Sequence, residues 1–252
     1  MSLFAEKVVV VTGAGSGIGR VTAQKFGAAG AIVVVSDIDE ESGFATVDLI
    51  EAEGGTATFI DANVAVFAEV KQLIMATVAR FGRIDVAVNN AGIGGKSMLK
   101  SAEHTHEDWD NIIAVNQTGV FYCMQLELQQ MMQQQSGVII NIASVAGLRG
   151  LPSNLAYVAS KHAVVGMTKT AAMEYAKYGI RVNAVCPVFT VTNLFNPDLF
   201  ENPALPEKLK RAIPMKRFAE PSEMADAILY LSSDAASFIT GHALPVDGGL
   251  TA

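Results

Sequence analysis

Cysteine is nearly absent from this sequence of 252 residues, which contains only Cys123 and Cys186. The two lie far apart and have no partners at metal-ligand spacing, so the pattern argues against both a disulfide framework and a cysteine-based metal site. Such sparse cysteine usage is typical of proteins in a reducing compartment. We therefore expect a cytoplasmic protein.

Positive charge and long hydrophobic runs are also scarce. Lys and Arg number 18 against 25 Asp and Glu, and the basic residues are scattered, so we expect no nucleic-acid partner. The apolar run near the N-terminus is far too short for a signal-peptide core, and no later run is long enough to span a membrane. We expect a soluble protein without a membrane partner.

Short apolar runs rich in β-branched residues are abundant instead, and they alternate with helical patterns. The runs are KVVVVTG, AIVVVSD, ATFIDAN, IDVAVNNAG, GVIINIAS, IRVNAVCP and HALPVDGG. Near-continuous apolar runs are typical of strands that are covered on both faces. We predict one α/β domain over residues 1–252, a Rossmann fold with a doubly wound, seven-stranded parallel sheet and helices on both faces. In such sheets ligands bind outside the carboxyl ends of the strands.

The segment TGAGSGIG, residues 12–19, follows the first run and opens the first helical pattern. Gly13 permits a tight turn, Gly17 lets the backbone approach a pyrophosphate, and Gly19 allows the helix to pack on the strand. The helix N-terminus offers N–H groups to the phosphates. Glycines alone could mark only a tight turn, but their position between a strand and a helix favours a dinucleotide-binding site.

Asp37 ends the second run, at the distance beyond the glycines where an acidic residue meets the adenosine ribose. A carboxylate there accepts hydrogen bonds from both ribose hydroxyls and repels a 2′-phosphate by about 1 to 4 kcal/mol at roughly 4 Å. Positions 16 and 38 carry Ser16 and Ile38, and neither is a basic residue that would offset this repulsion. We predict NAD(H) as the cofactor rather than NADP(H); the alternative is that Asp37 only caps the following helix.

Tyr157 and Lys161 stand four residues apart in LAYVASKHAVVG, residues 155–166, among small and apolar side chains. On a helix these two positions share one face, so a phenol and an ammonium group could serve one site. The alternative is a tyrosine packed on the core beside a lysine whose stem lies along apolar surface.

Together these segments resemble the short-chain dehydrogenase/reductase family, in its short single-domain branch of the NAD-dependent secondary alcohol dehydrogenase type. The resemblance runs over essentially the whole chain, and its motifs occur in the family's order. They are TGAGSGIG, NNAG at residues 89–92, the asparagine in VNQTG, the serine in IASVAG, YVASK, CPVFTVT and SFITGHALPVDGG.

The resemblance implies a catalytic tetrad of Asn116, Ser144, Tyr157 and Lys161. Moving a proton at the substrate oxygen needs a group whose pKa lies near the working pH, and Lys161, aided by oxidised nicotinamide, would lower the pKa of Tyr157. Ser144 would hold the substrate oxygen, unless it is only a turn or capping hydroxyl. Asn116 suggests a local kink in its helix and a water relay to Lys161, with a simple buried amide as the alternative.

The same resemblance implies a set of cofactor contacts. These are Gly13, Ser16, Gly17, Ile18, Gly19, Asp37, Ile38, Asn63, Val64, Asn89, Ala91, Gly92, Tyr157, Lys161, Pro187, Thr190 and Thr192. The chain departs from the family at two positions. Asn63 replaces the aspartate that usually holds the adenine amino group, and Val188 replaces the glycine that follows Pro187.

Residues 190–216 are rich in proline and carry apolar side chains between polar ones, which indicates a lid that closes over the substrate. A plain pair of surface helices is the alternative. The candidate substrate pocket is mainly apolar and comprises Ser144, Leu148, Leu151, Val188, Phe189, Leu194 and Phe195. We expect hydride transfer between NAD(H) and a hydrophobic secondary alcohol or ketone, including cyclic ones.

Other functions remain as alternatives. Within the enzyme class these are a hydroxysteroid or diol dehydrogenase and a 3-oxoacyl thioester reductase; Asp37 disfavours the latter, and only Lys96, Lys100 and Arg149 suggest a basic rim for a carrier protein. A nucleotide-binding regulator without turnover is disfavoured by the intact tetrad. The resemblance also implies a homotetramer, with the helices that carry Asn116 and Tyr157 forming one interface.

The histidines do not suggest a metal site. His104 and His106 lie two apart and so do not share a helical face, while Thr105 and Asp108 resemble a helix start with a capping box. His162 faces away from Lys161, and we expect it in the core or at a subunit interface.

Overall fold

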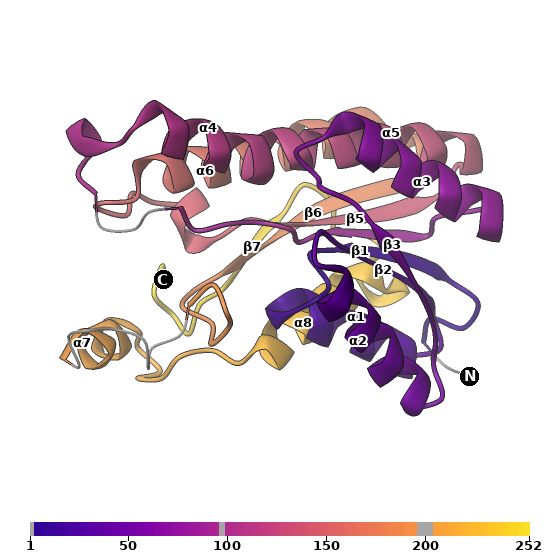
Figure 1. Ribbon diagram of the computed structural model, residues 1–252, viewed down its shortest axis with the longest axis horizontal. Coiled ribbons are helices and arrows are strands. Elements are labelled where there is room, and N and C mark those ends of the chain that lie inside the picture. Colours follow the sequence, from indigo (N-terminus) through magenta and orange to yellow (C-terminus); the bar gives the residue numbers. More distant parts are fainter. Residues whose placement is uncertain (1–2, 96–98, 196–203) are drawn as a thin grey trace.

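The computed structural model describes residues 3–95, 99–195 and 204–252 (Figure 1). Within these ranges seven strands form one parallel sheet in the order β3-β2-β1-β4-β5-β6-β7. The strands are β1 (Val8–Thr12), β2 (Ile32–Asp37), β3 (Thr56–Asp61), β4 (Val86–Asn89), β5 (Gly137–Ile142), β6 (Ile180–Pro187) and β7 (Ala243–Val246). Each strand lies within one predicted run, except that β3 begins one residue before its run, and the doubly wound α/β prediction is confirmed. The strand order reverses between β1 and β4, which is where such sheets bind ligands.

The valines of β1 show why the apolar runs are continuous. Val8 and Val10 belong to one hydrophobic cluster, whereas Val9 and Val11 belong to the cluster on the opposite face of the sheet. Successive side chains of a strand point to opposite faces, so a strand covered on both sides needs apolar residues at every position.

Helices cover both faces of the sheet, and Figure 1 shows them as two layers with the sheet between. One layer contains α1 (Gly17–Ala28), α2 (Glu40–Ala52) and α8 (Pro221–Ser232). The other contains α3 (Phe67–Phe81), α4 (His106–Ile113), α5 (Val120–Gln134) and α6 (Leu155–Tyr175). None of the helices in the described ranges is long and apolar enough to cross a lipid bilayer.

Polar side chains set the starts of two helices. The Asp39 carboxylate accepts the Ser42 N–H at 3.3 Å and caps α2. Thr105 caps α4 by accepting the Asp108 N–H at 3.1 Å, so the helix start predicted from Thr105 is confirmed.

A π-helical turn, Ala114–Gly119, joins α4 to α5. Such turns leave the ordinary i→i−4 ladder and are frequent at functional sites. Asn116 lies within it, so the local irregularity that the sequence suggests at this residue is present.

The predicted lid, residues 190–216, lies partly outside the described residues, because 196–203 are not described. Before that gap, Thr192 pairs with Phe195, and Thr190 pairs with Ala219 in an isolated parallel bridge. After the gap, α7 (Ala204–Ala212) stands apart from the sheet at the lower left of Figure 1.

Candidate active site

The turn between β1 and α1 adopts a backbone that depends on its glycines. Gly13 and Gly17 have φ angles of 61° and 53°, in the left-handed region that strains other residues. A Cβ on Gly19 would lie 2.1 Å from the Gly13 carbonyl oxygen, so only glycine lets α1 start this close to β1. The Ser16 side chain makes no capping hydrogen bond at the start of α1. It therefore leaves the first N–H groups of the helix for a phosphate.

Asn90 holds this turn in place. Its Nδ2 donates to the carbonyl oxygens of Thr12 and Gly13 at 3.0 and 2.9 Å. The Thr12 hydroxyl oxygen in turn accepts the N–H groups of Asn90 and Ala91 at 3.1 and 3.2 Å. The sequence resemblance predicts a cofactor contact for the neighbouring Asn89 and none for Asn90. The Asn89 side chain is buried, and its amide donates to Glu127 and Asn141.

Asp37 reaches the same turn from the end of β2. Its Oδ2 accepts the Gly15 N–H at 2.8 Å, and its Oδ1 accepts the Asp39 N–H at 3.1 Å. The alternative role considered for Asp37, capping α2, belongs to Asp39. Ile38 is largely exposed beside it. The carboxylate of Asp37 thus lies against the glycine-rich turn, where it can meet a ribose.

Arg20 is a second residue that sequence analysis missed. Its Nε donates to Thr46 Oγ1 at 3.0 Å, and its Nη2 donates to the carbonyl oxygens of Gly15 and Ser42. The guanidinium group therefore clamps the glycine-rich turn to α2. An arginine directly after GSGIG was the only signal for it in the sequence.

The loop after β3 carries Asn63 and Val64. Asn63 Oδ1 accepts the Ala65 N–H at 3.0 Å, and the oxygen keeps a second lone pair for another donor. Val64 packs against the π-helical turn, since a Cβ on Gly119 would lie 2.9 Å from Val64 Cγ2. This contact ties the β3 loop to the segment that carries Asn116.

Asn116 is fully buried and holds the loop after β4. Its Oδ1 accepts the Ile93 N–H at 2.8 Å and its Nδ2 donates to the Ile93 carbonyl oxygen at 2.8 Å. A Cβ on Gly92 would lie 3.3 Å from Asn116 Oδ1 and 3.6 Å from Lys161 Nζ. Gly92, Asn116 and Lys161 therefore meet at one point, as the tetrad requires.

Tyr157 and Lys161 project from one side of α6. Lys161 Nζ lies 5.6 Å from the centroid of the Tyr157 ring and donates to the Ile142 carbonyl oxygen at 2.8 Å. The lysine is 4% exposed, and burial lowers its pKa to about 8. Burial also raises the pKa of the Tyr157 phenol, so the protein chain alone does not provide the lowering that catalysis requires.

Ser144 follows β5 and faces Tyr157. Its hydroxyl oxygen accepts the Ala146 N–H at 3.1 Å, which caps the short 3-10 helix η3 (Val145–Gly147). A hydrogen bond from Ser144 to Tyr157 also lowers the pKa of the phenol, against the effect of burial. The capping role and the position beside Tyr157 therefore coexist.

The segment after β6 returns to the glycine-rich turn. A Cβ on Gly17 would lie 3.2 Å from Thr192 Cβ, so Thr192 lies over the turn expected to hold the pyrophosphate. The buried Thr190 hydroxyl donates to the Val188 carbonyl oxygen at 2.9 Å and supports the loop from within. Val188 is buried, and its side chain takes part in a cluster with Ile213 and Met224.

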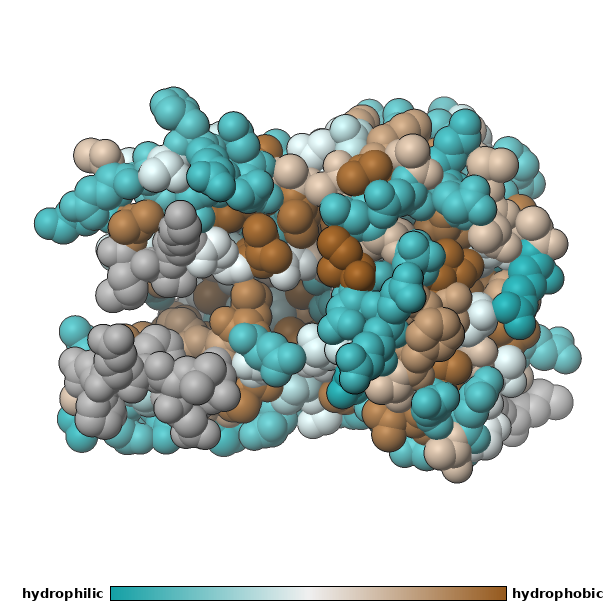
Figure 2. Space-filling model, viewed as in Figure 1, coloured by the Kyte–Doolittle hydropathy of each residue, from teal (hydrophilic) through white to brown (hydrophobic). Residues whose placement is uncertain are grey.

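Three aromatic side chains of this segment and of the chain after α7 form a cluster. Phe195 lies 5.1 Å from both Phe189 and Phe218, measured between ring centroids. Phe218 is not among the predicted pocket residues, because it lies beyond the predicted lid. Figure 2 shows the molecule hollowed at the left, between α4 above and α7 below, with hydrophobic residues along the recess.

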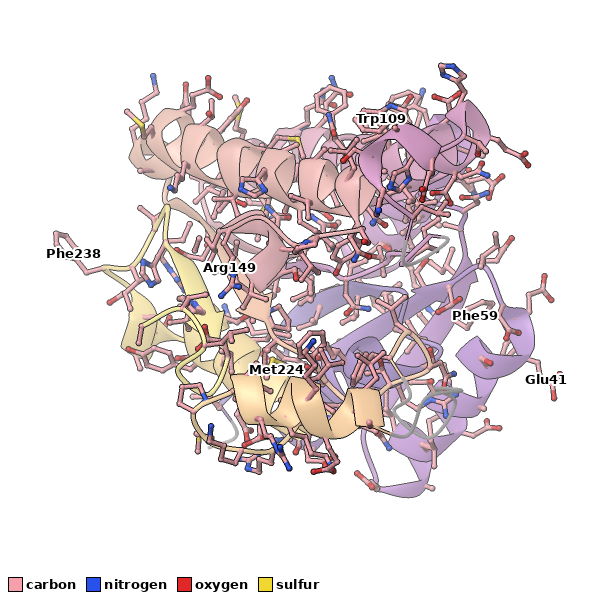
Figure 3. The ribbon with its side chains drawn as sticks, turned by 90° about the vertical axis from the view of Figure 1, so that its left-hand side faces the viewer. Glu41, Phe59, Trp109, Arg149, Met224 and Phe238 are labelled. Atoms are coloured by element: carbon pink, nitrogen blue, oxygen red, sulfur yellow. The ribbon has the colours of Figure 1, made fainter. Side chains whose placement is uncertain are left out.

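The other three predicted pocket residues, Leu148, Leu151 and Leu194, are not brought together in one place. Leu194 is exposed and approaches Gly94, whose Cβ would lie 3.2 Å from Leu194 Cδ1. Leu148 lines a separate groove of about 740 Å³ with Arg149 and the C-terminal residues. Figure 3 shows Arg149 between the upper helical layer and Met224. Leu151 is half-buried.

The histidines take other positions. His104 Nδ1 pairs with Asp108 Oδ2 at 3.2 Å. Throughout the described ranges, no group of three or more His, Cys, Asp or Glu side chains is placed to hold a metal ion. His162 is exposed, so the prediction of a core position is wrong, and an interface position stays a prediction.

Comparisons with known proteins agree with this geometry. A family model described as enoyl-(acyl carrier protein) reductase matches residues 13–251. A 2,5-dichloro-2,5-cyclohexadiene-1,4-diol dehydrogenase of Sphingobium indicum is 43% identical over 253 residues, which cover 100% of both chains.

Two solved structures are also similar. Levodione reductase has a TM-score of 0.94 and 37% identity and covers 98% of both chains. A 3-ketoacyl-(acyl-carrier-protein) reductase from Brucella melitensis complexed with NADH has a TM-score of 0.91 and 35% identity, over 99% of this chain and 100% of that one. The glycine-rich turn after β1 and the grouping of Asn116, Tyr157 and Lys161 agree with these matches. The chain belongs to the short-chain dehydrogenase/reductase family of oxidoreductases that act on CH–OH groups.

Proposed function

We propose that the protein is an NAD(H)-dependent dehydrogenase of hydrophobic secondary alcohols and the corresponding ketones. The observation that carries the proposal is the convergence of Asn116, Tyr157 and Lys161 beside Gly92, with Ser144 facing the phenol. The nicotinamide ring, when bound, would accept or donate the hydride. The chain supplies the proton transfer, the orientation and the apolar surroundings.

Tyr157 is the proposed acid and base at the substrate oxygen. Ser144 donates a hydrogen bond to that oxygen and holds it against the phenol as negative charge develops. Lys161, fixed by the Ile142 carbonyl oxygen, favours the phenolate form through its positive charge. Asn116 fixes the loop at Ile93 and lies close to Lys161, where a water molecule can connect the ammonium group to solvent.

Asp37 supports NAD(H) as the cofactor. A 2′-phosphate at roughly 4 Å from its carboxylate would be repelled by about 1 to 4 kcal/mol, which is about a five- to thousandfold preference. Arg20 is held within the turn, because its Nε and Nη2 already donate to Thr46, Gly15 and Ser42, and this favours a role in fixing the turn over one in binding a 2′-phosphate.

The apolar side chains of Val188, Phe189, Phe195 and Phe218 support a neutral, hydrophobic substrate. Similarity to a dehydrogenase of a cyclohexadiene diol makes ring alcohols and diols the first substrates to test. A 3-oxoacyl thioester reductase is the second candidate, because a reductase of that type is a structural neighbour and Arg149 lines an open groove. We also propose a homotetramer and a lid at residues 190–216.

The decisive experiment measures initial rates of NADH and NADPH oxidation side by side against cyclic ketones, diketones, steroids and oxoacyl thioesters. Turnover of apolar ketones with NADH supports the proposal, whereas turnover of thioesters with NADPH alone refutes it. The Tyr157→Phe variant should bind NADH normally and lose turnover by at least about a hundredfold. Turnover like that of the wild type would refute the assigned chemistry, and a monomer in light scattering would refute the tetramer.

A further inference from the structure

A buried carboxyl group that the proposed mechanism does not use lies in the core between α5 and the sheet. Glu127 of α5 is 1% exposed, and its Oε2 accepts a hydrogen bond from Asn89 Nδ2 at 3.0 Å. None of the ion pairs formed by the described residues includes it. Burying an ionised carboxylate without a cation is costly, so the charge state of Glu127 needs an explanation.

A chain of hydrogen bonds fixes the orientation of the Asn89 amide. The Thr168 hydroxyl donates to the Val164 carbonyl oxygen at 2.8 Å, so its oxygen can accept from Asn141 Nδ2 at 2.9 Å. Asn141 Oδ1 then accepts from Asn89 Nδ2 at 3.0 Å. Exchanging the oxygen and nitrogen of Asn89 would set two oxygens against each other, so the nitrogen must face Asn141 and Glu127.

This orientation leaves one acceptor without a donor. Asn89 Oδ1 is buried and receives no hydrogen bond. An ionised carboxylate cannot supply one because it only accepts, whereas a carboxylic acid carries an O–H group. The same Glu127 side chain that receives a hydrogen bond from the Asn89 amide is therefore the natural donor to its oxygen.

We propose that Glu127 is protonated and that its O–H donates to Asn89 Oδ1, while Asn89 Nδ2 donates to the other carboxyl oxygen. The two side chains then form a neutral, cyclic acid–amide pair. This pair satisfies the buried amide oxygen and avoids burying a charge.

The surroundings of Glu127 favour the neutral form. Burial raises its pKa to about 7, while the hydrogen bond from Asn89 acts in the opposite direction. The buried titratable side chains on α5 and on the elements packed against it are Cys123, Lys161 and Cys186. The other titratable groups on these elements are exposed or half-buried, namely Glu69, Lys71, Arg80, Tyr122, Tyr157, His162, Lys169, Glu174, Tyr175 and Arg181. Cys123 interacts with Glu127 electrostatically, and negative charge on either group disfavours ionisation of the other.

The pair also braces the cofactor turn, which makes Glu127 a positioning residue. Asn89 ends β4 and directly precedes Asn90, whose side chain holds the carbonyl oxygens of Thr12 and Gly13. Ionisation of Glu127 removes the donor to Asn89 Oδ1 and loosens the strand end from which Asn90 projects. Protonation of Glu127 does not depend on the proposed function, but its effect on coenzyme binding rests on the nicotinamide site.

The test compares the wild type with Glu127→Gln, whose amide can donate to Asn89 Oδ1 and accept from Asn89 Nδ2 at every pH. Because the unfolded carboxyl has a pKa near 4.5 and the folded one near 7, the stability that the proton provides is complete below pH 4.5 and is lost as the pH rises through 7. The melting temperature of Glu127→Gln minus that of the wild type should therefore increase by about 5 to 10 °C as the pH rises from about 5 to about 8. The matched control Glu174→Gln removes an exposed carboxylate and should follow the wild type.

Two further readouts separate the parts of the proposal. Infrared spectra of the wild type at mildly acidic pH should contain the carbonyl band of a protonated carboxylic acid, and Glu127→Gln should lack it. Should that variant fail to fold, loss of the band in the wild type as the pH rises through about 7 is the test. A constant gap in melting temperature and no acid band would overturn the proposal. The NADH dissociation constant should rise with pH more in the wild type than in Glu127→Gln; equal profiles would refute the positioning role alone.

Discussion

The proposed preference for NADH over NADPH depends on one carboxylate, and Asp37→Asn tests it with the least change in shape. The asparagine oxygen can still accept the Gly15 N–H that Asp37 Oδ2 accepts at 2.8 Å, which keeps the bond to the glycine-rich turn. The hydrogen bond that Asp37 Oδ1 accepts from the exposed Asp39 N–H is lost, and solvent can replace it. The substitution removes the negative charge that would face a 2′-phosphate. Since that repulsion is about 1 to 4 kcal/mol at roughly 4 Å, the ratio of kcat/KM for NADPH to that for NADH should rise about five- to thousandfold.

Salt and a neighbouring carboxylate provide the controls. The effect should shrink at high ionic strength, because the screening length falls from about 10 Å at 0.1 M to about 3 Å at 1 M. Asp39→Asn removes an equal charge two residues away and keeps a good cap for α2, so it should leave the coenzyme ratio unchanged. An unchanged ratio in Asp37→Asn, or an equal change in Asp39→Asn, would refute the reasoning.

Two further substitutions test other parts of the site. Asn90→Ala removes the donors to the carbonyl oxygens of Thr12 and Gly13, at a cost of about 1 to 3 kcal/mol. The NADH dissociation constant, measured by fluorescence, should therefore rise roughly five- to hundredfold. An unchanged constant would show that the turn keeps its conformation without Asn90. Burial lowers the pKa of Lys161 from 10.5 to about 8, so a charged lysine costs stability below pH 8. Lys161→Met should therefore abolish turnover yet raise the free energy of unfolding near pH 7 by up to about 3 kcal/mol; a lower stability in denaturant titrations would contradict this.

The features that sequence could predict are local ones. The glycine-rich turn needs only consecutive residues, and the pair Tyr157 and Lys161 needs only helical periodicity. The seven strands follow from near-continuous runs of β-branched residues, because a strand that is buried on both faces needs apolar side chains at successive positions.

The features that sequence missed depend on contacts between distant segments. Glu127 stands between two leucines in LELQQ, at the start of a glutamine-rich stretch where a charged residue is expected to face solvent, and only the packing of α5 on β4 shows that it is buried. Asn89 was expected at a ribose, but side chains alternate along β4, so Asn89 faces the same layer as Ala87 while Asn90 turns to the glycines. Strand alternation was thus a signal that could have distinguished the two asparagines.

The pairing of β1 with β4, which are far apart in the sequence, has a consequence for biosynthesis. Asn90, which holds the turn after β1, lies 78 residues beyond Thr12 in the chain, and β1 has β4 as its second neighbour in the sheet. At about 5 to 20 residues per second, a ribosome needs roughly 4 to 16 seconds to add that stretch. During this time the turn lacks its clamp and one edge of β1 is unpaired. The nascent chain is therefore most open to aggregation, and least able to bind a nucleotide, before its fourth strand emerges.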